Sequence, residues 1–131
     1  MKILDSDHCV ALLRGRLDLQ GHGEPDDILA VTTVGVGELC HGAHKSSRPE
    51  QNLARLDYLL TRLAILPYDE SSARWFGQIK ARLEQTGERL DDIDIQIASI
   101  ALANEFVLVT HNIGHFGRLA RTEGIKLDDW L

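Results

Sequence analysis

Cysteine, aromatic residues and long apolar runs are all scarce in this chain of 131 residues. The two cysteines, Cys9 and Cys40, are too few for the disulfide framework of a small secreted protein. No stretch approaches the roughly 18 consecutive apolar residues that a membrane-spanning helix requires. Met1 and Lys2 lead directly into an apolar segment, which leaves no room for a secretory signal. We therefore expect a cytoplasmic protein that has no part in a membrane.

Positive charge is also in short supply, because 14 Lys and Arg face 20 Asp and Glu. The formal net charge of −6 argues against nonspecific binding of nucleic acid, which needs clustered cations. A group of carboxylates around a metal ion would produce the same surplus of negative charge, whatever the charge of the rest of the surface. The charge therefore counts slightly against a nucleic-acid partner and slightly in favour of an acidic pocket.

Apolar residues, by contrast, make up an ordinary 44% of the chain, and a chain of this length suits a single domain, residues 1–131. Strands are predicted at residues 3–4, 28–33, 64–67, 106–110 and 125–127. Helices are predicted from just after Asp7 to Gly15 and at about residues 35–45, 50–63, 70–85, 93–103 and 113–122. This alternation predicts an α/β fold whose central, mainly parallel sheet of four to five strands is covered by helices on both faces.

Acidic and amide side chains stand where such a sheet gathers ligands, outside the carboxyl ends of its strands. Asp5 ends the first strand, and Glu38 lies in the first turns of the helix after the second strand. Asp94 stands at the head of the helix at 93–103, and Asn112 follows Thr110 at the end of strand 106–110. Oxygen ligands without a thiolate suit hard cations such as Mg²⁺ or Mn²⁺. Carboxylates closer together than about 6 Å would raise one another's pKa unless a cation neutralised them.

Each of these residues also has an ordinary structural explanation. Asp5 and Asp7 are good helix N-caps, and Asp91, Asp92 and Asp94 are favourable near a helix N-terminus. Glu38 could be a solvated helix residue. For any one of these residues, the structural explanation and a role in a metal site carry about equal weight. Glu38 and Asp94 both stand beside strongly apolar runs, however, which favours a shared site.

Other patterns could carry different chemistry. Glu38, His41 and His44 recur every three residues and could form a transition-metal face, although helical spacing produces such triplets by chance and a structural zinc would want a fourth ligand. His111 and His115 are expected to flank the site or to face solvent. Six arginines could hold phosphates near the site, or could simply lie on solvated helix faces: Arg14, Arg48, Arg55, Arg62, Arg118 and Arg121.

Four segments together resemble PIN-domain ribonucleases, and in particular the VapC toxins of bacterial toxin–antitoxin systems. They are residues 3–7 (ILDSD), 33–43 (TVGVGELCHGA), 94–98 (DIQIA) and 108–112 (LVTHN). Residues 48–53 and 64–69 resemble the connecting elements of that family, and Asp129-Trp130 resembles its usual ending. Each motif is weak alone, but their order and spacing are specific, and the resemblance covers essentially the whole chain.

This resemblance implies a PIN-like three-layer fold and a set of site residues. Asp5, Glu38 and Asp94 match the three core acidic positions, which would hold Mg²⁺ or Mn²⁺. Asn112 falls where many members carry a fourth acid and others carry Asn, and Thr110 matches a Ser or Thr beside the metal. Asp7, where relatives commonly carry Asn, would stand in the next layer out with Thr110. The implied activity is hydrolysis of an RNA phosphodiester by metal-activated water, and the implied partners are a VapB-like antitoxin and a second copy of the chain.

Two other function classes remain open at this point. A phosphatase of the haloacid dehalogenase type would use Asp5 as a covalent nucleophile, with Asp7 as its neighbour and Asp91-Asp92 as a late acidic pair. A non-catalytic regulator with an acidic pocket, such as a phospho-receiver domain, would use the same first acids. Both want a lysine that no segment offers in a convincing place, and the phosphatase leaves Glu38 without a role. The sequence therefore favours a metal-dependent endoribonuclease.

Overall fold

The computed structural model describes all of residues 1–131, in which strands alternate with helices. The strands are β1 (Lys2–Leu4), β2 (Leu29–Thr32), β3 (Ala64–Leu66), β4 (Val107–Val109) and β5 (Leu127–Asp128). The helices are α1 (Ser6–Leu13), α2 (Thr33–Lys45), α3 (Pro49–Leu60), α4 (Glu70–Gln85), α5 (Asp92–Asn104) and α6 (Ile113–Glu123). The predicted alternation is therefore confirmed for every element.

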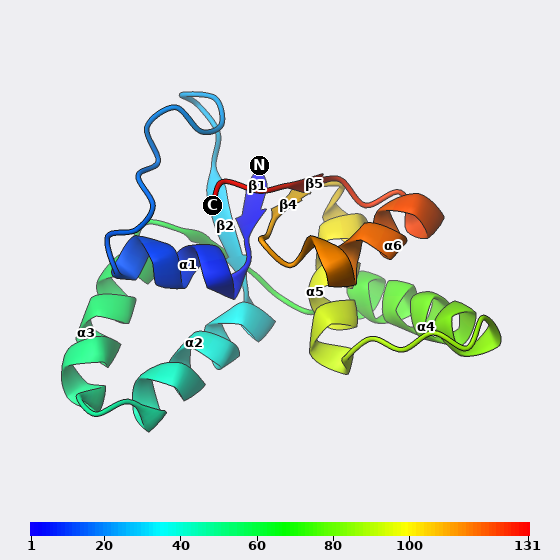
Figure 1. The fold of residues 1–131 in the computed structure, drawn as a ribbon, viewed down its shortest axis with the longest axis horizontal. Helices are drawn as coiled ribbons and strands as arrows, with labels where there is room; N and C mark the ends of the chain where they lie inside the picture. Colours follow the sequence, from blue (N-terminus) through cyan, green and yellow to red (C-terminus); the bar gives the residue numbers. More distant parts are fainter.

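The five strands form one sheet in the order β3-β2-β1-β4-β5, and every neighbouring pair is parallel. Helices α1, α2 and α3 lie on one side of the sheet, and α4, α5 and α6 lie on the other (Figure 1). From the central strand β1 the chain adds β2 and then β3 on one side. It then crosses over and adds β4 and β5 on the other side of β1. The crevice beside the carboxyl ends of β1 and β4 is thus the switch point where sheets of this kind bind ligands.

Each side of the sheet has its own buried cluster of apolar side chains. The cluster under α4, α5 and α6 includes Ile3, Ile79, Ile97 and Phe116, all fully or almost fully buried. The cluster under α1, α2 and α3 includes Leu4 and Leu56. Ile3 and Leu4 point to opposite sides because successive side chains of a strand alternate. The short central strand β1 therefore joins both halves of the core, and Asp5 follows it directly.

Most element boundaries differ by one to three residues from those that the sequence predicts. The second strand ends at Thr32 rather than Thr33, because the Thr32 hydroxyl accepts a hydrogen bond from the backbone N of Gly35 (2.9 Å) and so starts α2 two residues early. The last strand pairs at Leu127–Asp128 rather than at residues 125–127. Helix α5 is buried at Ile95 and over residues 97–101, but Ile93 in its first turn is 43% exposed.

Cys9 and Cys40 are both free thiols. Burial, reinforced by the charges of Asp5 and Asp7, raises the pKa of the Cys9 thiol to about 12, so this side chain behaves as a small apolar group. None of the six helices is long and apolar enough to cross a membrane.

Candidate functional site

Asp5 and Thr110 face each other across the switch point, one after β1 and the other after β4. The Thr110 hydroxyl donates to Oδ2 of Asp5 (2.8 Å), and the backbone N of Ser6 donates to Oδ1 (2.9 Å). Burial raises the pKa of Asp5, and the negative charges of Asp7 and Asp94 add to the rise, while the bond from Thr110 opposes it. Asp5 is therefore fixed in orientation but is costly to ionise as it stands.

Asp7 holds the loop after β4 in place. Its Oδ2 accepts a hydrogen bond from the backbone N of His111 (2.9 Å), and its Oδ1 lies 2.7 Å from Nδ1 of the buried His8. Burial would raise the pKa of Asp7, but the bonds from His8 and His111 outweigh it and lower the pKa below the ordinary value. Asp7 is thus a carboxylate that the fold stabilises in its charged form, in contrast to Asp5.

Glu38 reaches the same place from the second turn of α2. Its Oε1 atom is buried and has no hydrogen-bond partner. Burial raises the pKa of Glu38, and the charges of Asp5 and Asp94 raise it further. A buried carboxylate oxygen without a partner loses its hydration and gains nothing in return. The atom is therefore free to bind a cation or a donor from outside the chain.

Asp94 and Asn112 meet at the ring of His115 on α6. The Nδ1 atom of His115 lies 2.9 Å from Oδ2 of Asp94 and 2.8 Å from Nδ2 of Asn112. One ring nitrogen cannot donate to Asp94 and accept from the Asn112 amide at the same time. The charge of Asp94 favours the donor role, because hydrogen bonds to a carboxylate are the stronger ones. His115 therefore orients Asp94, a function that its sequence position did not reveal.

These side chains line a cavity of about 340 Å³ that contains no hydrophobic residue. Its lining residues are Asp5, Ser6, Asp7, Glu38, Asp94, His111 and Asn112. The structure thus brings together the predicted Asp5, Glu38, Asp94, Asn112 and Asp7, and Thr110 lies behind Asp5 as its donor.

The donor set of this cavity fits a hard cation, although its side chains are not closed into a ligand cage. No three acidic, histidine or cysteine side chains anywhere in the protein lie close enough together to hold a metal ion as they stand. Asp5 and Asp94 are instead held by Thr110 and His115. The fit rests on carboxylate oxygens from three separate elements and on the unpartnered Oε1 atom of Glu38.

The competing arrangements do not gather in this way. His41 and His44 are exposed and do not line the acidic cavity with Glu38. Asp91 and Asp92 line a different cavity from Asp5, so they do not supply the late acidic pair of a phosphatase. No lysine lines the acidic cavity, as a phospho-receiver would require.

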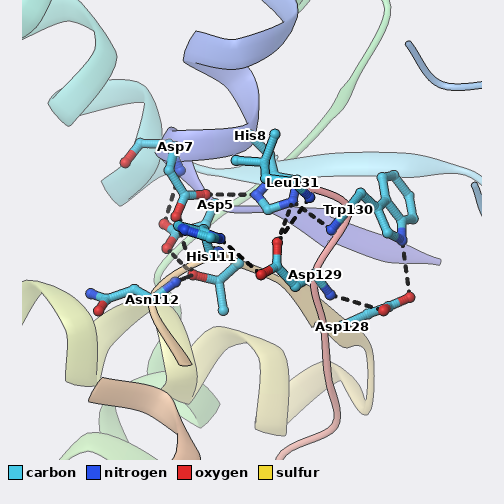
Figure 2. Close-up of polar contacts among 11 residues, drawn as sticks. Asp5, Asp7, His8, His111, Asn112, Asp128, Asp129, Trp130 and Leu131 are labelled. Atoms are coloured by element: carbon cyan, nitrogen blue, oxygen red, sulfur yellow. Dashed lines mark hydrogen bonds and ion pairs between the residues drawn. The ribbon is translucent and has the colours of Figure 1, made fainter. Parts of the chain in front are cut away.

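The end of the chain supports the site from behind (Figure 2). The resemblance of Asp129-Trp130 to the usual ending of the family did not reveal this role. The backbone N of Trp130 donates to Nε2 of His8 (3.0 Å), so the proton of this ring is on Nδ1, which faces Asp7. Asp129 in turn accepts at Oδ2 from Nδ1 of His111 (2.8 Å). Asp7, His8, the C-terminal segment and His111 therefore form a closed network around the loop that carries Thr110 and Asn112 (Figure 2).

Replacing Glu38 by glutamine should stabilise the protein in the presence of a chelator. The raised pKa of Glu38 means that the folded chain holds this proton more tightly than the unfolded chain does. Protonation of Glu38 therefore stabilises the folded protein. This stabilisation is complete below the ordinary carboxyl pKa and is lost as the pH rises through the raised pKa of Glu38. We expect Glu38→Gln to raise the melting temperature by about 2 °C at pH 7.5 and by less at pH 5.

The control is Glu50→Gln, which makes the same change at an exposed position of α3. It should raise the melting temperature at neither pH value in thermal melts with EDTA, because the charge of Glu50 lies in the first turn of α3, where it favours the helix. A Glu38→Gln protein that melts lower than wild type at pH 7.5 would show that this carboxylate is not a strained charge.

Residues 2–122 match the family model of the PIN domain. The chain is 36% identical over 103 residues to ribonuclease VapC2 of Haemophilus influenzae, an alignment that covers 79% of this chain and 76% of that protein. It is also 36% identical over 102 residues to the tRNA(fMet)-specific endonuclease VapC of Salmonella typhimurium, covering 78% of this chain and 75% of that one.

Solved structures agree with the sequence comparisons. VapBC2 of Rickettsia felis, bound to a DNA fragment from its promoter, matches with a TM-score of 0.87 and 29% identity, over 99% of this chain and 98% of that chain. VapBC of Salmonella typhimurium bound to DNA matches with a TM-score of 0.83 and 31% identity, over the same shares of both chains. These matches confirm the predicted fold, and every neighbouring pair of strands in its sheet is parallel.

Proposed function

The chain belongs to the PIN-domain family, and from that premise we propose that it is an endoribonuclease, the toxin of a VapBC-type toxin–antitoxin pair. It cuts RNA phosphodiester bonds with the help of Mg²⁺ or Mn²⁺, and a VapB-like protein restrains it. The names of its relatives support the ribonuclease activity, and the solved VapBC complexes support the antitoxin partner. The homodimer that the family resemblance implies stays a prediction.

Each residue of the cavity has a separate task in this reaction. Asp5, Glu38 and Asp94 would hold the cation, which when bound supplies an activated water and stabilises the leaving oxygen. Thr110 keeps Oδ2 of Asp5 in one orientation, and His115 does the same for Asp94. Asp7 fixes the backbone of His111 and so places Asn112 at the rim, where its amide can orient the RNA or a water.

One observation carries the proposal: a carboxylate that directly follows β1 and carboxylates on α2 and α5 share a cavity without a hydrophobic residue, and one of their buried oxygens has no partner. The test is an assay of the purified protein on initiator tRNA and on total RNA, chosen because two relatives that match the chain are tRNA(fMet)-specific endonucleases. We expect cleavage with Mg²⁺ or Mn²⁺ and none with EDTA. Cleavage that persists in EDTA would refute the requirement for a metal ion, and the absence of any cleavage would refute the ribonuclease activity.

Asn112→Asp should reduce the Mg²⁺ concentration needed for half-maximal cleavage by about threefold or more. The added charge lies at the rim of the acidic cavity, beside His115, and strengthens the attraction for a divalent ion. Without metal the added charge is repelled by the carboxylates of the acidic cavity, which outweighs the gain from an acid at the N-cap of α6, so the variant should melt below wild type in EDTA. Mg²⁺ titrations of cleavage and thermal melts check the two effects.

Gln20→Glu is the control, since it adds one negative charge at an exposed position of the loop between α1 and β2. It should change neither quantity. If Asn112→Asp also changes neither, Asn112 lies outside the shell of groups that act on the metal.

A further inference from the structure

The lysines and arginines that form ion pairs and those that do not lie on different helices. On α4 and α6 most of them are matched, as in Arg82 with Glu123 (2.6 Å) and Arg118 with Glu88 (3.2 Å). From the start of α1 to the turn just after α3, in contrast, no lysine or arginine forms an ion pair with a carboxylate. This unmatched set comprises Arg14, Arg16, Lys45, Arg48, Arg55 and Arg62. The side of the sheet covered by α1, α2 and α3 thus carries free positive charge in a chain that is acidic overall.

Two of these cations line a second cavity that adjoins the acidic one. This cavity, of about 440 Å³, lies among α1, α2 and α3 and shares Ser6 and Glu38 with the acidic cavity. Arg14, at the end of α1, and Arg55, on α3, are both part of its lining. A strand that leaves the acidic cavity past Glu38 would therefore meet these two arginines.

Both arginines have donors to offer. The side chain of Arg14 makes no hydrogen bond and no ion pair within the protein, and Arg55 uses one N–H, from Nη2, on the backbone oxygen of Leu13. That bond ties Arg55 to the end of α1 without neutralising its charge. A guanidinium has five N–H donors in a planar fork, a geometry that suits two oxygens of a phosphate.

The cavity on the other side of the site offers no such place. It is larger, about 730 Å³, and includes His115 beside Asp94. Its lining holds four carboxylates, of Glu84, Glu88, Asp91 and Asp92, against three cations. Two of those cations, Lys80 and Arg118, are already paired with Asp92 and Glu88. A phosphate would be repelled there and attracted to the cavity with Arg14 and Arg55.

We propose that Arg14 and Arg55 form a subsite that binds a phosphate of the RNA strand next to the one that is cut. This inference rests on the proposed ribonuclease function and adds the path that the strand takes away from the metal site. Arg14 and Arg55 line only the second cavity and not the acidic one, so a phosphate that they bind is a neighbour of the scissile phosphate. The subsite supplies the positive charge that the acidic cavity lacks.

The test measures RNA binding apart from cleavage. Fluorescein-labelled initiator tRNA is titrated in EDTA with proteins that all carry Asp5→Asn, so that no RNA is cut. Arg14→Gln and Arg55→Gln should each weaken binding about five- to tenfold. Each should also reduce the slope of log affinity against log salt by about 0.7, the value for one lost contact with a single-stranded phosphate. Arg14→Lys should keep the slope, since it keeps the charge.

The matched control is Arg121→Gln, at an exposed, unpaired arginine on α6, on the opposite side of the sheet (Figure 1). It should leave affinity and slope unchanged. Arg55→Gln loses the bond to Leu13 and should melt lower than the parent, so binding is measured well below the melting temperature of every variant. Equal losses in Arg121→Gln, or no loss in Arg14→Gln and Arg55→Gln, would overturn the subsite. Variants that keep RNA binding but no longer bind the cognate antitoxin would assign this cavity to the protein partner instead. A wild-type protein that cuts no RNA would refute the proposed function itself, a result that the cleavage assay reports separately.

Discussion

Asp5→Asn is expected to fold normally and to cut RNA at least about 100-fold more slowly than wild type. Replacing a residue that merely supports a metal ligand already costs about 10- to 100-fold, so loss of a ligand charge should cost no less. The fold should tolerate the change because asparagine caps a helix as well as aspartate does and can still accept from the N of Ser6. Its NH₂ group would face the Thr110 hydroxyl, which can accept as well as donate.

The raised pKa of Asp5 makes this prediction sharper. Because ionised Asp5 is a strained charge, the neutral variant should melt no lower than wild type in EDTA. Asp57→Asn, on the exposed side of α3, is the control and should keep full activity. Cleavage by Asp5→Asn at the wild-type rate, under single-turnover conditions with Mg²⁺, would remove Asp5 from the mechanism.

The fold could be predicted from the sequence because local pattern and tertiary environment agree along most of the chain. Residues 106–110 are apolar and β-branched, and the structure buries Leu108 and Val109 completely. Segments 50–63 and 70–85 show helical spacing and become α3 and α4. The errors fall at boundaries where one side chain decides. The hydroxyl of Thr32 starts α2 early, and no periodicity reveals such a cap.

The site could be predicted as far as its acids, because the ends of parallel strands meet at one edge. Asp5, Glu38, Asp94 and Asn112 line one cavity, as their positions after strands and at helix starts indicated. The supporting residues could not be found in this way. His8 reaches Trp130, 122 positions away, and His111 reaches Asp129 through contacts that only the folded chain creates. For the same reason the sequence could not tell Arg14 and Arg55 from the arginines that are paired.

Expression of this protein without its antitoxin should stop the growth of its native host within a few generations. A nuclease that cuts an RNA needed for translation removes a component that every cell division requires. Asp5→Asn, expressed to the same level, should leave growth normal, and so should co-expression of the wild-type protein with the cognate antitoxin. Optical density, viable counts and the integrity of initiator tRNA are followed together, so that arrest can be tied to cleavage.

The acidic cavity also indicates how an antitoxin could prevent the arrest. A partner side chain of Arg or Lys that enters the cavity would pair with carboxylates that the folded chain leaves strained, and would give Oε1 of Glu38 the donor it lacks. Glu38→Gln should then weaken the complex with the antitoxin by at least about tenfold in calorimetry, whereas Glu50→Gln should not. If Glu38→Gln binds the antitoxin as tightly as wild type does, the partner acts from outside the cavity. Normal growth despite verified soluble expression of the wild-type protein would contradict the proposal that the protein is a toxin.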